Sequence, residues 1–234
     1  MYKLLKIELM KVDCKHYLGI AFLIPVVVLA FLYFFASIPH FDPTVQISDS
    51  EIASYSFILN MAFLLNSAGF IFLGATMLGK LIIESYSNKN IYLTLSYPVS
   101  RERIFFSKLG IVCLLGSILS ALSLAIIDIV FLSAEKILPL VHDQLNIYLL
   151  VKQIPMIFLS ILLVPAIDTC SLWIGWKKRS IALTFFSSLV LFSLVGNSAS
   201  LGTNTLFYIF TIFYFFGALF SSLSLVNQVK RIEI

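Results

Sequence analysis

Charge is scarce in this 234-residue chain: Asp, Glu, Lys and Arg make up 12% of the residues, whereas 60% are hydrophobic. A soluble domain usually carries about 25% charged residues, so the composition excludes an ordinary soluble globular protein. Several uncharged stretches are long enough to span a bilayer, which takes about 20 apolar residues per helix. The sequence therefore predicts an all-α, polytopic membrane protein.

Residues that carry metal or catalytic chemistry are also scarce. Cys14, Cys113 and Cys170 are scattered without the spacing of a metal site, which favours a role as small apolar fillers. An intramembrane hydrolase would need paired aspartates, a Ser-Lys pair or His-Glu-x-x-His at a common depth, and the sequence offers none of these. We predict that the chain is not an enzyme and holds no metal or cofactor of its own.

Charged residues divide the chain into six predicted spans within a single transmembrane domain, 1–234. The fifth span is short because the polar stretch GNSASLGTN at 196–204 interrupts the apolar run. Its 15 residues would reach only about 22 Å, less than the roughly 30 Å hydrocarbon core. The predicted spans are 17–38, 52–79, 109–134, 153–176, 181–195 and 205–226.

Basic residues predict the orientation of these spans, because they collect in cytoplasmic loops. Of the 16 lysines and arginines, only Lys136 and Lys152 fall on one side, which leaves 14 on the other. With an even number of spans, both termini share the basic side. We therefore expect both termini and the longest inner loop, 80–108, to be cytoplasmic.

The stretch GATMLGKL at 74–81 has the frame G-x-x-x-x-G-K of a nucleotide-binding P-loop. A P-loop follows a strand, opens a helix and ends in Ser or Thr. Here the motif lies at the end of a predicted span, and Leu81 stands at the Ser/Thr position. We predict that its glycines permit close approach of helices and bind no phosphate.

The loop 80–108 contains an apolar and aromatic centre, IYLTLSYPVS, which a purely solvated loop does not need. Pro98 should end a short helix at or before Tyr97, and Ser100 is a suitable N-cap for a helix that leads into the third span. Two interpretations follow from the residues alone. The loop either docks on another protein or lies flat on the membrane surface.

The loop also resembles the coupling loop of permease subunits of type-two ATP-binding-cassette (ABC) exporters. The family pattern ends in P-V-S-R-x-x-I-x-x-x-K, and a Gly-Thr pair of that pattern is replaced here by residues of the stretch 88–90. The matching residues are Glu84, Leu95, Pro98, Val99, Ser100, Arg101, Ile104 and Lys108.

This resemblance implies a partner and a mode of docking. In such exporters the loop forms a coupling helix in a cleft of a separate ATPase subunit, which binds ATP and magnesium. It implies two ATPase copies and a second permease subunit, identical or homologous. The coupling contacts would be apolar at Ile91, Tyr92, Leu95 and Tyr97, with Pro98 and Ser100 shaping the turn and Glu84, Arg101 and Arg103 forming a polar rim.

The small size and short outer loops resemble bacterial permeases for bacteriocin or lantibiotic self-immunity and for peptide-toxin export. The expected location is the bacterial plasma membrane, and the expected cargo is an amphipathic or antimicrobial peptide, without nucleic acid. A lipid, drug or glycan precursor is the alternative cargo. A non-transporting membrane scaffold is the alternative class.

Three further features of the sequence lead to expectations. Residues 1–16 have an apolar stripe and four lysines, which predicts a helix lying at the lipid interface. Asp128 and Asp168 fall inside spans, where ionisable groups are candidates for function. Their distances from the span ends place Asp128 near the outer interface and Asp168 toward the inner side, so they should not pair. Asp168 is the candidate for a pathway residue or a buried contact between helices.

Overall fold

A computed structural model describes residues 14–41, 54–86, 101–137, 141, 147–199 and 204–230. The helices are α2 (Cys14–Phe41), α4 (Tyr55–Leu78), α6 (Arg101–Glu135), α7 (Ile147–Lys178), α8 (Ile181–Ala199) and α9 (Asn204–Lys230). A π turn (Gly79–Ile83) and a 3-10 turn (Glu84–Tyr86) extend α4. No strand occurs in these described ranges, so the all-α prediction is confirmed for them.

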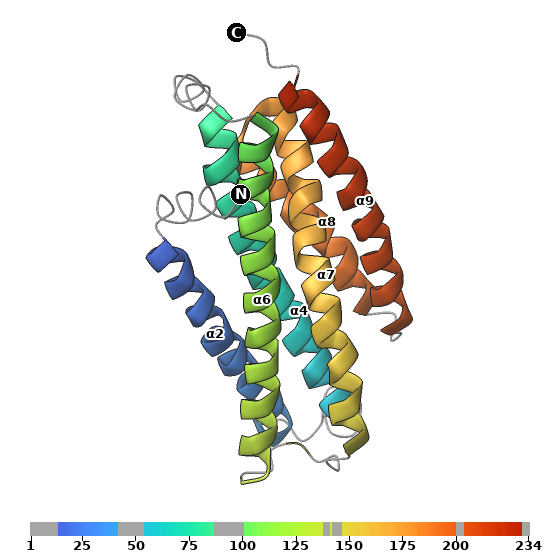
Figure 1. Ribbon diagram of the computed structural model, residues 1–234. Helices are drawn as coiled ribbons and strands as arrows, with labels where there is room; N and C mark the ends of the chain where they lie inside the picture. Colours follow the sequence, from blue (N-terminus) through green and yellow to red (C-terminus); the bar gives the residue numbers. More distant parts are fainter. Residues whose placement is uncertain are drawn as a thin grey trace.

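The helices form one bundle whose centre is α4 and α7 (Figure 1). Helix α4 contacts α2, α6, α7 and α8, and helix α7 also contacts α6, α8 and α9. Helix α2 crosses the others obliquely on one side, and α9 covers the other side (Figure 1). The two central helices therefore contact most of the other elements.

Five helices are long and apolar enough to cross a membrane, namely α2, α4, α6, α7 and α9. Helix α8 is a shorter apolar helix of 19 residues. The predicted span ends at 195, and the helix continues to Ala199. In this last part of the helix, the side-chain amide of Asn197 donates to the carbonyl of Ser193 at 2.8 Å. At 1.5 Å per residue the helix reaches about 28 Å.

The other boundaries differ from the predicted ones mainly because helices continue past the apolar stretches. Helix α6 begins at Arg101, directly after Ser100, and runs without a break into the third predicted span, as expected. Helix α7 begins at Ile147, before the predicted start at 153. Helix α2 begins at Cys14 and passes through the predicted junction at 16–17. Residues 1–13, most of the predicted interfacial helix, lie outside the described residues.

Helix α7 accommodates two prolines in its interior, Pro155 and Pro165. Because proline has no N–H, Pro165 leaves the carbonyl of Ile161 without its usual helical donor. The hydroxyl of Ser117 in α6 donates to that carbonyl at 3.1 Å. A neighbouring helix thus satisfies the group that proline frees, as is usual in membrane helices.

Polar contacts fix the register between α4 and α6 in the middle and at one end. Asn66 donates from its amide nitrogen to the carbonyl of Ser120 at 3.0 Å and accepts from the Ser123 hydroxyl at 2.6 Å. At one end the Tyr55 hydroxyl donates to Glu135 at 3.2 Å. Glu135 is the last residue of α6, and only 2% of its surface is exposed. These contacts hold the two antiparallel helices in register.

Candidate functional site at the basic end of the bundle

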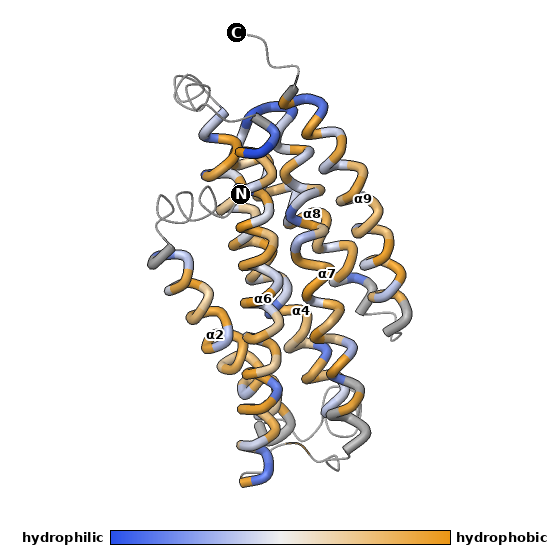
Figure 2. Tube along the Cα trace, in the orientation of Figure 1, coloured by the Kyte–Doolittle hydropathy of each residue, from blue (hydrophilic) through white to orange (hydrophobic). Residues whose placement is uncertain are grey.

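One end of the bundle carries most of the exposed bases. Here α4 and α7 finish and α6 and α8 begin, and the hydrophilic residues gather there (Figure 2). The loop 80–108 starts from this end and returns to it. We call this region the basic end, and its exposed bases are Lys80, Arg103, Lys177, Lys178 and Arg179.

Lys108 connects the two ends of the loop 80–108. We call these ends its feet: the turns 79–86 that follow α4, and the first turns of α6. Its ammonium donates to the carbonyl of Leu81 at 3.0 Å and to the Ser85 hydroxyl at 2.7 Å. The Ser85 hydroxyl in turn donates to the same Leu81 carbonyl at 2.7 Å. Only 7% of Lys108 is exposed, and a buried charge is tolerated when it is hydrogen-bonded. The π turn after α4 is therefore fixed to the first turns of α6.

An aromatic cluster lies beside this network. The Trp176 ring of α7 lies 5.3 Å from the Tyr86 ring and 6.0 Å from the Phe105 ring, both in edge-to-face geometry. Tyr86 and Phe105 are almost completely buried. Edge-to-face pairs of this kind are worth about 0.5–1.5 kcal/mol beyond their buried area. The cluster connects both feet of the loop to the end of α7.

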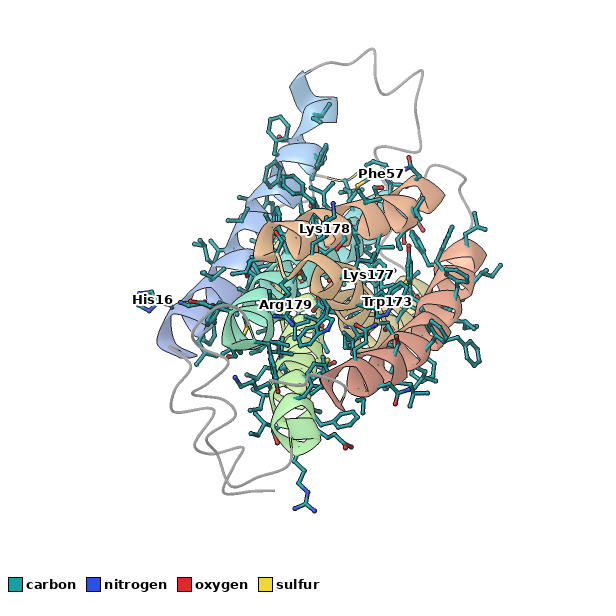
Figure 3. The ribbon with its side chains drawn as sticks, turned by 90° about the horizontal axis from the view of Figure 1, so that it is seen from above. His16, Phe57, Trp173, Lys177, Lys178 and Arg179 are labelled. Atoms are coloured by element: carbon teal, nitrogen blue, oxygen red, sulfur yellow. The ribbon has the colours of Figure 1, made fainter. Side chains whose placement is uncertain are left out.

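A tight turn between α7 and α8 places the three consecutive bases 177–179 at the surface. Arg179 has φ of 47°, in the left-handed region. Its N–H donates to the Trp176 carbonyl at 3.1 Å, and the Ser180 N–H donates to the Gly175 carbonyl at 3.3 Å, which is the Schellman pattern. A side chain at Gly175 would overlap Thr184, so the turn needs glycine there. Seen from above, Lys177, Lys178 and Arg179 lie over the middle of the bundle (Figure 3).

The predicted coupling residues fall partly within the described residues. Glu84 lies in the 3-10 turn and is exposed, Arg101 is the first residue of α6, and Arg103, two residues later, is exposed. The structure thus places these three polar residues at the two feet of the loop. The remaining predicted contacts lie outside the described residues: Ile91, Tyr92, Leu95, Tyr97, Pro98 and Ser100.

The segment GATMLGKL occupies the end of α4 and the start of the π turn. A side chain added at Gly74 would overlap the Asp168 carboxylate, and one added at Gly79 would come within 2.7 Å of Ile181. The glycines therefore permit close approach of α7 and α8, as predicted. The segment is helical and does not form the strand–loop–helix geometry of a P-loop.

Asp168 is buried in the contact between α7 and α4, with 1% of its surface exposed. Neither carboxylate oxygen has a hydrogen-bond partner among the described residues, and the same holds for Asp128, which is 5% exposed. Asp168 lies opposite Gly74, whereas Asp128 lies beyond Ser123, the residue opposite Asn66. Since Gly74 and Asn66 are about 12 Å apart along α4, the two acids do not pair, as predicted. Asp168 therefore lies where α7 contacts α4, but it makes no hydrogen bond to α4 among the described residues, so its role stays a prediction.

Comparisons with known proteins find a similar protein, but they indicate no activity. No family model matches the chain, and no solved structure matches it. The chain is similar to the uncharacterized protein YcbO of Bacillus subtilis strain 168, with 25% identity over 229 residues. The alignment covers 97% of this chain and 98% of that protein. The similarity therefore extends over nearly the whole length of both chains.

Sequence reasoning missed most of the residues that hold the basic end together. Lys108 matched a family pattern, but its contacts to Leu81 and Ser85 were not foreseen. Trp176 was taken only as the end of a span, although it joins three segments. The available signal was the placement of large aromatics at three span ends on the basic side, which would bring them together in a bundle.

Proposed function

We propose that the chain is the permease subunit of an ATP-driven ABC exporter in a bacterial plasma membrane, with both termini cytoplasmic. A separate ATPase, in two copies, would supply ATP hydrolysis. A second permease subunit, identical or homologous, would complete the transport path. The cargo would be an amphipathic or antimicrobial peptide.

The observation that carries this proposal is the fixed base of the loop 80–108. Lys108, Ser85 and Leu81 join its two feet, and Trp176 joins both feet to α7. A loop that only covers the membrane surface does not need rigid connections to two central helices. A loop that receives force from an ATPase does need them, because motion at its tip must reach the helices.

The charge of the basic end is consistent with a protein partner. The exposed bases 177–179 lie over the middle of the bundle (Figure 3). Glu84 and Arg103 are exposed in the segments where the loop 80–108 leaves α4 and enters α6. Such groups around an apolar centre give the polar rim that is typical of protein interfaces. The apolar loop residues would then supply most of the affinity, at about 1.5–3 kcal/mol for each buried side chain.

Affinity purification from native membranes tests the proposal. The tagged chain should co-purify with an ABC ATPase in mild detergent. Leu95→Asp should lower the yield of ATPase at least about tenfold, since it places a charge in an apolar cleft. Ile137→Asp is the matched control, because Ile137 is 79% exposed at the opposite end of α6. Absence of an ATPase, or equal yields from both variants, would contradict the proposal and favour a scaffold.

A further inference from the structure

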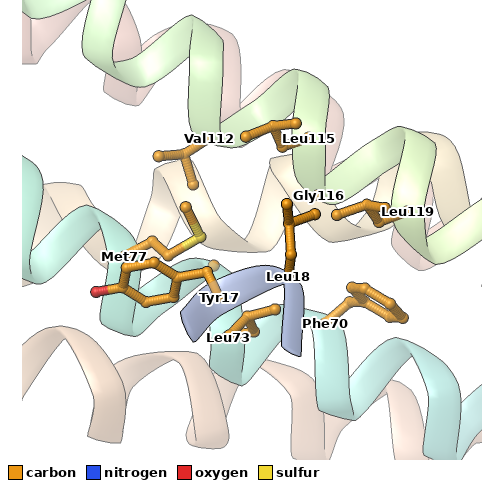
Figure 4. Close-up of a pocket in the computed structure, with 10 residues that line it drawn as sticks. Tyr17, Leu18, Phe70, Leu73, Met77, Val112, Leu115, Gly116 and Leu119 are labelled. Carbon is orange, nitrogen blue, oxygen red and sulfur yellow. The ribbon is translucent and has the colours of Figure 1, made fainter. Parts of the chain in front are cut away.

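Two surface features of the bundle could receive a partner, and they differ in charge. An apolar groove of about 160 Å³ lies between α2, α4 and α6, and Leu18, Leu73 and Leu115 are among the residues that line it (Figure 4). None of the described residues that line this groove is charged, so its chemistry does not select one partner over another. The turn between α7 and α8 instead presents the three consecutive bases 177–179, which are all exposed. This turn therefore carries chemistry that a partner can recognise.

The end of α7 from which these bases project is covered by protein. Residues 163–176 are all buried or half-buried. Trp176 packs against both feet of the loop 80–108, and the Trp173 indole N–H donates to Ser224 of α9 at 3.1 Å. A basic residue that anchors a helix in lipid headgroups instead lies above a lipid-facing surface. The bases over the middle of the bundle (Figure 3) are therefore placed for a partner in the aqueous phase.

Arg179 occupies a position at which glycine is more stable. Its φ of 47° lies in the left-handed region, which costs a residue with a side chain about 1 kcal/mol relative to glycine. Conformations of this kind are found most often at functional sites. Ser180 follows directly and caps α8, with its hydroxyl accepting from the Leu183 N–H at 3.4 Å. Local hydrogen bonds thus hold the turn and present the arginine at a fixed place.

The three bases differ in their contacts. The Lys177 ammonium lies 4.0 Å from the centre of the Trp173 ring, and this cation–π contact accounts for Lys177 within the chain. The side chains of Lys178 and Arg179 make no hydrogen bond, ion pair or ring contact with a described residue. The turn thus displays two positive charges without a partner in the described part of the chain. Carboxylates are the protein groups that pair with such charges.

We propose that the turn 177–179 is a second docking point for the ATPase, where Lys178 and Arg179 pair with carboxylates on the ATPase surface. This inference rests on the proposed exporter function, in which the loop 80–108 makes the first contact at the same end of the bundle. The centre of that loop is apolar, whereas the turn supplies charge, and complementary charge sets the rate and the orientation of docking. Because Lys178 ends α7 and Ile181 begins α8, a partner on the turn contacts the junction of two helices.

Crosslinking with a water-soluble carbodiimide tests the contact directly, because this reagent joins a lysine amine to a carboxylate that touches it. The full chain in phosphatidylcholine nanodiscs is mixed with its purified ATPase, and crosslinked peptides are mapped by mass spectrometry. We expect a link between Lys178 and an aspartate or glutamate of the ATPase, and none from Lys136, an exposed lysine at the opposite end of the bundle. Lys178→Arg should remove the link, because arginine has no amine that the reagent couples, and should bind the ATPase more tightly than Lys178→Glu does.

Affinity measurements on the same complex test the charge. Lys178→Glu and Arg179→Glu should each raise the Kd for the ATPase about fivefold in about 0.1 M salt. The increase should be smaller in about 0.5 M salt, because salt screens exposed charges. Lys136→Glu is the matched control and should leave the Kd unchanged. Size-exclusion chromatography of the loaded nanodiscs checks that each variant is inserted and monodisperse.

The outcomes distinguish a failure of this inference from a failure of the exporter proposal. If the wild-type chain binds the ATPase, but Lys178 forms no crosslink and both glutamate variants bind equally well, the second docking point is overturned and the exporter proposal stands. The two bases would then be anchors to anionic lipid headgroups. If the wild-type chain does not bind the ATPase, both the exporter proposal and this inference are contradicted.

Discussion

The central helix α4 and the peripheral helix α2 differ in a way that reverses the rule for soluble proteins, in which the most apolar segments are the most buried. In the most apolar stretch of α2, 17% of residues are buried, against 61% in that of α4. Yet α2 is the most apolar of the five long helices, and α4 is the least apolar. Lipid is as apolar as leucine, so hydrophobicity alone does not bring helices together in a membrane.

Small and polar residues distinguish the central pair. Helix α4 contributes Asn66 and Gly74 to contacts with α6 and α7, and α7 contributes Asp168 and Gly175. Helix α9 instead presents large apolar side chains, such as Phe213, to its surroundings. Close approach and hydrogen bonds thus define the centre of this bundle, and bulky apolar side chains define its periphery.

Gly74→Val gives the largest effect expected from this comparison. The added side chain would collide with Asp168 at the contact between α4 and α7, which should lower the free energy of unfolding by about 3 kcal/mol. Gly19→Val in α2 is the matched control, because nothing lies within 4 Å of its added Cβ. It should change stability by less than about 0.5 kcal/mol. Unfolding in mixed SDS micelles measures both.

A double variant sharpens that result. If the collision with the carboxylate is the cause, Asp168→Ala should restore part of the stability lost in Gly74→Val. Equal losses from Gly74→Val and Gly19→Val would show that the central and peripheral helices do not differ as described.

Lys108→Met is expected to give an intermediate effect. It removes charged hydrogen bonds to Leu81 and Ser85, and hydrogen bonds of this kind contribute about 1.5–3 kcal/mol. Hydrogen exchange of residues 81–86 should accelerate with the loss of stability. Lys178→Met, at an exposed position of the same end, should leave both the exchange rates and the unfolding free energy nearly unchanged. Equal exchange rates and unfolding free energies for the two variants would contradict the proposed role of Lys108 at the base of the loop.

Arg179→Gly should give the smallest effect, and it should be a gain. Arg179 has positive φ, which costs a residue with a side chain about 1 kcal/mol relative to glycine. The free energy of unfolding of the variant should therefore be higher by about 1 kcal/mol. Lys178→Gly, at the last position of α7, should instead lose stability because glycine is a poor helix former. A loss in Arg179→Gly would indicate that the arginine side chain stabilises the turn.

The sequence predicted the large features because they depend on composition and local rules. Long uncharged runs predicted the helices, and Ser100 before RERIFFSK predicted the start of α6. The close approach at Gly74 followed from its small size next to a predicted span end. These signals lie within one segment, so one sequence suffices to read them.

The remaining features depend on contacts between segments. The buried Glu135 accepts a hydrogen bond from Tyr55, which lies 80 positions away in the sequence. The network of Lys108 likewise joins residues from two helices. A single sequence does not show which distant groups meet, so these contacts could not be predicted from composition.

ATP hydrolysis by the reconstituted complex tests the exporter proposal most directly. The purified chain alone, and its Lys80→Ala variant, should show no ATP binding or hydrolysis. Together with its co-purifying ATPase in proteoliposomes, it should support hydrolysis that an amphipathic cationic peptide stimulates, and Leu95→Asp should abolish that stimulation. Hydrolysis by the chain alone, or peptide stimulation that persists in Leu95→Asp, would contradict the proposed role of the loop 80–108.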